Sequence, residues 1–340
     1  MPETTPPLAT PKRDSLPSRV WQVVSCNNKA ICITTAVVAV VGTVLALSGC
    51  ASGTPSPASP ATLAVVATTT QVADFSRQVA GTTATVTGLV QANQSVHGFD
   101  PSAKNLLDLA AADVLVTSGV DLEAWLNDAI EASGFAGTVI DASTGITLIG
   151  NDPHLWTNPA NAVLMVQNIA AGFAAADPEQ ADAFQTNAVA YETQLTALDS
   201  WIIANVDQVP LAERLLVTNH DAFTYFYDAY DITFVGSIIP SLDDNAEPSA
   251  AELDALIAAI KTTGAKAVFS EASLSPKLAQ TIAEEAGVAV YSGEDALYSD
   301  SLGAAGSAGA TYLSATIHNV TVLMDSWGYE LLPLPATLSL

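Results

Sequence analysis

The feature that most limits the fold is a repeated alternation between short β-branched apolar runs and longer amphipathic stretches. The runs are apolar throughout, which is typical of parallel strands buried on both faces. They lie at 63–68, 84–90, 113–117, 138–141, 214–218, 232–237, 266–270 and 288–292. Helical patterns between them lie at 71–81, 102–112, 122–133, 221–230, 249–263 and 276–286. The sequence therefore predicts an α/β protein with parallel sheets.

The runs fall into two groups, before residue 150 and after residue 210, so we expect two similar lobes. Between the groups, Asn158-Pro159 marks a helix start, and after Asp177-Pro178 a second helical pattern covers 178–206. A helix of that length spans about 43 Å, enough to cross both lobes. The expected divisions are a first lobe at 63–176, a linking helix at 177–208, a second lobe at 209–330 and a tail at 331–340.

The N-terminal region has the pattern of a bacterial lipoprotein signal. Lys29 precedes an apolar run that ends in Leu-Ser-Gly-Cys at Cys50, where cleavage and lipidation of the thiol are expected. A transmembrane helix is the alternative, which the placement of Cys50 disfavours. We expect residues 1–50 to be the signal segment and 51–62 a flexible Ser/Pro-rich tether. The protein would then lie outside the cytoplasm, anchored to the bacterial cell membrane by lipid.

Cysteine content and charge exclude several classes of function. The cysteines are Cys26, Cys32 and Cys50, so the chain beyond the expected anchor has neither a disulfide nor a thiolate ligand. The formal net charge of −25 would repel nucleic acid and anionic surfaces. Any site chemistry must therefore come from histidine, carboxylate or hydroxyl groups.

Histidine is rare, with four in 340 residues, and its placement is informative. His97, His154 and His220 each follow a predicted strand, and ligands bind beyond the carboxyl ends of strands in open α/β sheets. His318 lies in the last amphipathic stretch, and we interpret it as structural. Three imidazoles and one carboxylate would make a four-ligand zinc shell. For the carboxylate, spacing leaves open a choice among Glu294, Asp295 and Asp300.

Several segments, in order along the chain, resemble the ZnuA/TroA-like metal-binding proteins of zinc and manganese ABC importers. The likeness covers almost all of 62–328, and its most specific segments are VHGFDPSAKNLLDLAAADVLVTSGVDLEAWL at 96–126, NDPHLWTNPANA at 151–162, LLVTNHDAFTYF at 215–226 and YSDSLG at 298–303. The long His/acid-rich loop that zinc-importing members have before the second histidine is missing. The first motif also lacks the usual Pro before His97.

The resemblance implies two (β/α)₄ lobes joined by one long helix, with a metal ion held in the cleft between them. It assigns the ligand role to His97, His154, His220 and, through YSDSLG, Asp300. It implies a non-enzymatic, monomeric solute-binding lipoprotein that captures Zn²⁺ or Mn²⁺ and delivers it to an ABC permease and its ATPase. A surface adhesin with the same fold is an alternative. A zinc hydrolase is a weaker one, because a fourth ligand would close the coordination shell.

The type of ligand favours zinc, because imidazole suits Zn²⁺ while an all-oxygen shell suits Mn²⁺. Among the neighbouring residues, Glu271 ends a strand and is expected to hydrogen-bond a ligand imidazole. Asp152 and Asp221 each adjoin a histidine and would orient its ring or set a turn. Glu123 is interpreted as part of a helix start, and Trp125 as a packing residue between the lobes.

Overall fold

The structure is a computed structural model that describes residues 62–338. The predicted signal segment, Cys50, and the tether apart from Thr62 lie outside the described residues. Within the described part, no helix is both long enough and apolar enough to cross a membrane.

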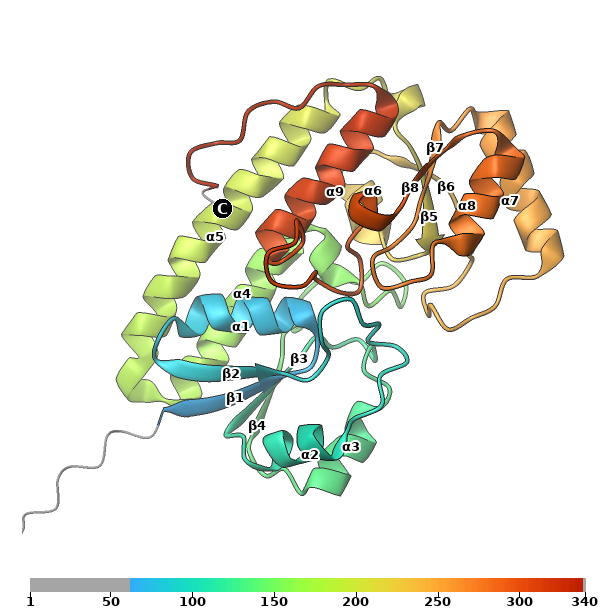
Figure 1. Cartoon of the computed structure of the whole chain (residues 1–340). Coiled ribbons are helices and arrows are strands. Elements are labelled where there is room, and N and C mark those ends of the chain that lie inside the picture. The colour runs from blue at the N-terminus through green and yellow to red at the C-terminus, as the bar shows by residue number, and fades with distance from the viewer. Residues whose placement is uncertain (1–61, 339–340) are drawn as a thin grey trace, which may run out of the picture. The chain divides into compact units, whose positions relative to one another are not determined.

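The first lobe contains one parallel sheet of four strands in the order β2-β1-β3-β4. Val65 and Val66 of β1 show why the runs are continuously apolar. Val65 belongs to the core shared with helices α1, α4 and α5, whereas Val66 packs in a separate cluster with α2 and α3. The helices therefore cover both faces of the sheet (Figure 1). The elements are β1 Leu63–Ala67, α1 Thr70–Ala80, β2 Ala84–Gly88, α2 Ala103–Ala110, β3 Val114–Thr117, α3 Leu126–Ser133 and β4 Thr138–Asp141.

The second lobe also has parallel strands, but its sheet is less regular. The strand ladders pair β5 with β6 and β7 with β8, and β5 lies beside β7 without a ladder between them. Strands β7 and β8 are short, and a bridge between Glu271 and Leu297 adds one further parallel pair. The elements are β5 Leu215–His220, α6 Thr224–Ala229, β6 Thr233–Ile239, α7 Ala250–Thr263, β7 Ala267–Phe269, α8 Lys277–Ala286, β8 Ala289–Tyr291 and α9 Tyr312–Trp327. The prediction of an α/β fold with parallel sheets is confirmed.

Two consecutive helices, α4 (Pro159–Ala176) and α5 (Ala181–Val206), connect the sheets. Asn158 caps α4 by accepting a hydrogen bond from the Ala160 N–H, and a single 3₁₀ turn separates the helices. The predicted helix at 178–206 therefore begins at Ala181, because its first residues form that turn. Helix α5 has 26 residues, about 39 Å, and packs against α1 and α4 in one part of its length and against α9 in another (Figure 1).

Candidate metal centre

The structure brings four predicted residues together where strand ends and loops of both lobes meet. His97 lies in the loop after β2, and His154 immediately precedes a 3₁₀ turn (Leu155–Thr157). His220 is the last residue of β5, and Asp300 lies in the loop between β8 and α9. One potential ligand atom from each residue lies within 4.8 Å of all the others.

The donor atoms have the spacing that a small cation requires. His97 Nε2 lies 3.3 Å from His154 Nε2 and 3.4 Å from an Asp300 carboxylate oxygen. Asp300 is also 3.2 Å from His154 Nε2 and 3.1 Å from His220 Nε2. A tetrahedral ion with bonds of about 2.1 Å holds its ligand atoms about 3.4 Å apart. The measured separations are therefore close to those of one such ion, and all four donor atoms lie within 4.8 Å of one another.

Burial makes this arrangement costly unless a cation is held. His154, His220 and Asp300 are fully buried, whereas the His97 side chain keeps 9% of its surface exposed. Both carboxylate oxygens of Asp300 and Nε2 of His220 form no hydrogen bond with any described residue. Unpaired polar atoms in such a place lose hydration with no compensation. A cation bound among these atoms would provide the electrostatic stabilisation that they lose when water is excluded.

In two of the imidazoles, a carboxylate contacts Nδ1, the ring nitrogen that faces away from the cluster. Asp152 Oδ1 accepts hydrogen bonds from Nδ1 of His154 (2.6 Å) and from its backbone N–H (2.9 Å). Asp152 therefore both orients the ring and sets the turn. Glu271 Oε2 lies 2.7 Å from Nδ1 of His220, a charge contact without hydrogen-bond alignment, while its Oε1 accepts from the His220 N–H at 2.9 Å. In both rings the free Nε2 faces the cluster.

The pKa values of His154, His220 and Asp300 are shifted by their mutual contacts. Burial lowers the pKa of His154, but the charge of Asp300 and the hydrogen bond to Asp152 outweigh it and raise the pKa to about 9. Burial also opposes charging of His220, while Glu271 and Asp300 raise its pKa well above the ordinary value. For Asp300, burial raises the pKa, but the two imidazoles pull it well below its usual range. The cluster is thus arranged to hold positive charge.

The remaining candidates lie apart from the four donor atoms. Glu294 and Asp295 are exposed on a 3₁₀ turn (Gly293–Asp295), and the His318 ring is hydrogen-bonded to the Ala296 carbonyl at 3.0 Å. The Asp221 backbone N–H donates to the Ser241 carbonyl, and its carboxylate forms no described contact with the His220 ring. Of the three acids that spacing left open, only Asp300 is in the cluster.

Trp125 and Glu123 make contacts that the sequence did not predict. Trp125 packs edge-on against Phe99 within the first lobe, and its Nε1 donates to the Val96 carbonyl, one residue before His97. Glu123 lies just before α3, where its carbonyl accepts from the Leu126 N–H, as a helix start requires. Its buried carboxylate also accepts from the Ser118 N–H (2.7 Å), the Gly119 N–H (3.3 Å) and the Thr68 hydroxyl, and so secures a loop. The sequence does not show whether a Trp packs within a lobe or between lobes. Nor does it show whether a Glu before a helix also hydrogen-bonds a loop.

A hollow between the lobes leads to His97. It is lined from the first lobe by Val120, Asp121, Leu148 and Asn151, and from the second lobe by Leu242 and Asp243. His97 is the ligand candidate on this wall, in keeping with its partial exposure. Solvent therefore reaches the cluster from the His97 side.

Fold and site together define a two-lobed α/β protein with one cluster of candidate metal ligands among the described residues. Residues 65–326 match the model of the family described as zinc-uptake complex component A, periplasmic. The chain belongs to this family, whose members are solute-binding proteins, so the prediction of a non-enzymatic carrier is confirmed.

The named relatives are metal-binding proteins. The chain is 31% identical over 300 residues to the manganese-binding lipoprotein MntA of Bacillus subtilis, covering 84% of this chain and 96% of the relative. It is 27% identical to the iron-binding protein YfeA of Yersinia pestis, covering 78% and 86%. The periplasmic zinc-binding protein TroA from Treponema pallidum has a similar structure, with a TM-score of 0.72 and 25% identity over 77% of this chain and 98% of that one.

Proposed function

We propose that this protein is an extracytoplasmic lipoprotein that captures Zn²⁺ through His97, His154, His220 and Asp300. It would deliver the ion to an ABC permease while Cys50 anchors it to the membrane. The observation that carries the proposal is the four-donor cluster, with spacings of 3.1–3.4 Å around a buried carboxylate that has no hydrogen bond within the described residues. Family membership supports the import role.

Zinc is favoured over manganese by the donor atoms. Three imidazole nitrogens and one carboxylate form a compact shell of borderline ligands, and divalent affinities rise from Mn²⁺ towards Zn²⁺ at such sites. The relatives named for manganese and iron make Mn²⁺ the second candidate, because cellular supply can outweigh affinity. A second oxygen from Asp300 would give Mn²⁺ a larger shell.

The arrangement suits carriage better than catalysis. Four protein ligands occupy a tetrahedral shell, so no position is left for an activated water. His97 is the exposed ligand and comes from the loop that borders the hollow. An ion would thus enter and leave past His97 while the other three side chains stay buried.

Titration calorimetry of the chain from residue 51 onward, with Zn²⁺ and with Mn²⁺, tests the proposal. The expected result is one ion per chain, with Zn²⁺ bound at least about ten-fold more tightly. Absence of saturable binding by either ion, in a protein shown by circular dichroism to be folded, would refute the carrier role. If Mn²⁺ binds more tightly than Zn²⁺, the proposed cargo would be manganese and not zinc.

A further inference from the structure

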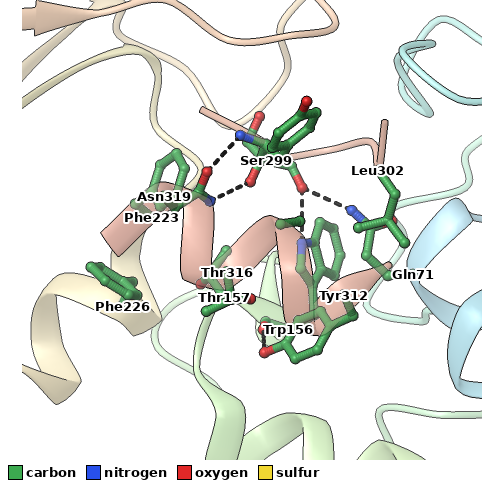
Figure 2. Close-up of a pocket in the computed structure, with 12 residues that line it drawn as sticks. Gln71, Trp156, Thr157, Phe223, Phe226, Ser299, Leu302, Tyr312, Thr316 and Asn319 are labelled. Atoms are coloured by element: carbon green, nitrogen blue, oxygen red, sulfur yellow. Dashed lines mark hydrogen bonds between the residues drawn. The ribbon is translucent and has the colours of Figure 1, made fainter. Parts of the chain in front are cut away.

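The segment that carries Asp300 is held through its main chain by side chains from the first lobe. The Ser299 carbonyl accepts two hydrogen bonds, from Gln71 Nε2 at 2.8 Å and from Trp156 Nε1 at 3.0 Å (Figure 2). Gln71 lies on α1 and Trp156 in the turn after His154, and both are buried. Two donors from one lobe therefore converge on the peptide that precedes a ligand of the other lobe.

The residues on either side of Ser299 and Asp300 are held as well. Asn319 of α9 bonds both backbone groups of Tyr298, accepting from its N–H at 2.8 Å and donating to its carbonyl at 2.7 Å (Figure 2). Thr70 of α1 accepts from the Leu302 N–H at 2.8 Å. The second lobe thus fixes Tyr298 and also holds the side chain of Ser299, whose hydroxyl donates to Glu271. The first lobe holds the Ser299 carbonyl and the Leu302 N–H.

Gln71 is an unusual residue for its place. Gln71 is almost fully buried, and a buried amide is unfavourable unless it is hydrogen-bonded. Its Oε1 accepts from the Thr70 hydroxyl at 3.0 Å, and its Nε2 donates to Ser299. The described hydrogen bonds of Gln71 are therefore made with Ser299, next to Asp300, and with Thr70, which also holds this segment.

The surroundings give the Ser299 peptide room to shift. A cavity of about 20 Å³ beside it is lined by residues that include Thr157, Phe223, Phe226 and Thr316. This is space for one water molecule. Without Gln71, the carbonyl would keep only the Trp156 donor, and a water in the cavity could compete for it and let the Asp300 carboxylate shift relative to the histidines.

We propose that Gln71 is a positioning residue that keeps Asp300 on the metal ion by tying its backbone to the first lobe. The inference rests on the proposed metal-carrier function. Because Gln71 touches none of the three histidines in the described contacts, it acts through Ser299. Trp156 makes the same bond but also packs edge-on against the His154 ring at 5.5 Å, so Gln71 gives the cleaner test.

The experiment compares the full chain with its Gln71→Met variant, which keeps the side-chain length and loses the donor. Zn²⁺-loaded protein is mixed with excess EDTA, and the dissociation rate is followed by stopped-flow. We expect dissociation to become about ten-fold faster and association to change less than about two-fold. Co²⁺-loaded variant should show an altered d–d absorption spectrum, because the carboxylate ligand has moved.

Gln167→Met is the matched control. Gln167 lies on α4 and bonds Glu192 at the surface at 2.9 Å, so its loss should leave both rates unchanged. If Gln71→Met does not fold, Thr70→Val removes the acceptor for Leu302 and should accelerate dissociation in the same way. Unchanged dissociation in a folded variant, even one that melts earlier, would overturn the inference. Failure of the unsubstituted protein to bind a metal would refute the proposed function instead.

Discussion

His97 and His154 both come from loops of the first lobe, yet the structure holds them in different ways. His154 is fully buried, and its Nδ1 donates to Asp152, whose own backbone carbonyl accepts from the Tyr225 hydroxyl of the second lobe at 2.9 Å. His97 has no carboxylate on its Nδ1 among the described contacts and borders the hollow. The position of the His154 ring is therefore fixed by its neighbours, whereas the His97 ring is accessible to solvent from the hollow.

The comparison teaches how one site can bind tightly and still exchange its ion. A ligand whose ring is held by neighbours costs little entropy to bind, whereas a ligand at the surface can detach without opening the core. His220, buried and in contact with Glu271, resembles His154 in this respect. In the proposed carrier, the two fixed imidazoles would provide affinity, and His97, whose side chain is 9% exposed, would allow exchange.

The largest expected effect separates the two histidines by substitution. His154→Ala should lower Zn²⁺ affinity by more than about 100-fold, because it removes a ligand and leaves Asp152 buried without its partner. His97→Ala should cost less, since water can take the place of an exposed ligand. Titration calorimetry of both variants measures the difference, with His318→Ala as the control that should bind normally. Equal losses for His97→Ala and His154→Ala would remove the distinction.

The second prediction concerns pH. A metal ion binds neutral imidazole, and the pKa of about 9 for His154 means that this ring is protonated at neutral pH before the metal arrives. The raised pKa of His220 acts in the same direction. Affinity should therefore fall continuously as the pH drops from about 9, and not only below the ordinary imidazole value of about 6.5.

Proton release measures this effect directly. Calorimetry at pH 7 in two buffers of different ionisation enthalpy should show about two protons released per Zn²⁺ bound, one from each fixed histidine. Release of no protons, with an affinity that stays level between pH 7 and 9, would contradict the raised pKa values.

How far the sequence predicts this site depends on the residue. The three histidines could be found because carboxyl ends of parallel strands meet at one edge of a sheet, so their positions after strands already implied proximity. Asp300 could not be separated from Glu294 and Asp295 by spacing, because all three lie in one loop. It was assigned by resemblance, and the structure places the other two on an exposed turn.

The supporting contacts were the least predictable part. Gln71 and Ser299 are 228 positions apart, and nothing local in either segment indicates their hydrogen bond. The second lobe's two separate strand ladders were also unexpected, because a short apolar run predicts a strand but not which neighbour it pairs with. Fold class follows from periodicity, whereas side-chain partners depend on how the lobes pack.

The smallest effect tests the carboxylate behind His154. Asp152→Asn keeps an oxygen for the Nδ1–H of His154 but weakens the hydrogen bond to a carboxylate that, after the charge of Asp300, raises the pKa of the ring. Zn²⁺ affinity should fall about ten-fold at about pH 10, one unit above that pKa, where the ring is largely neutral, and the pH at which affinity levels off should move down. Asp108→Asn is the control, because Asp108 pairs with Lys104 on α2 and is not part of the cluster. If the two variants behave alike, the fixed position of His154 comes from packing alone, and the contrast with His97 is one of burial and not of hydrogen bonding.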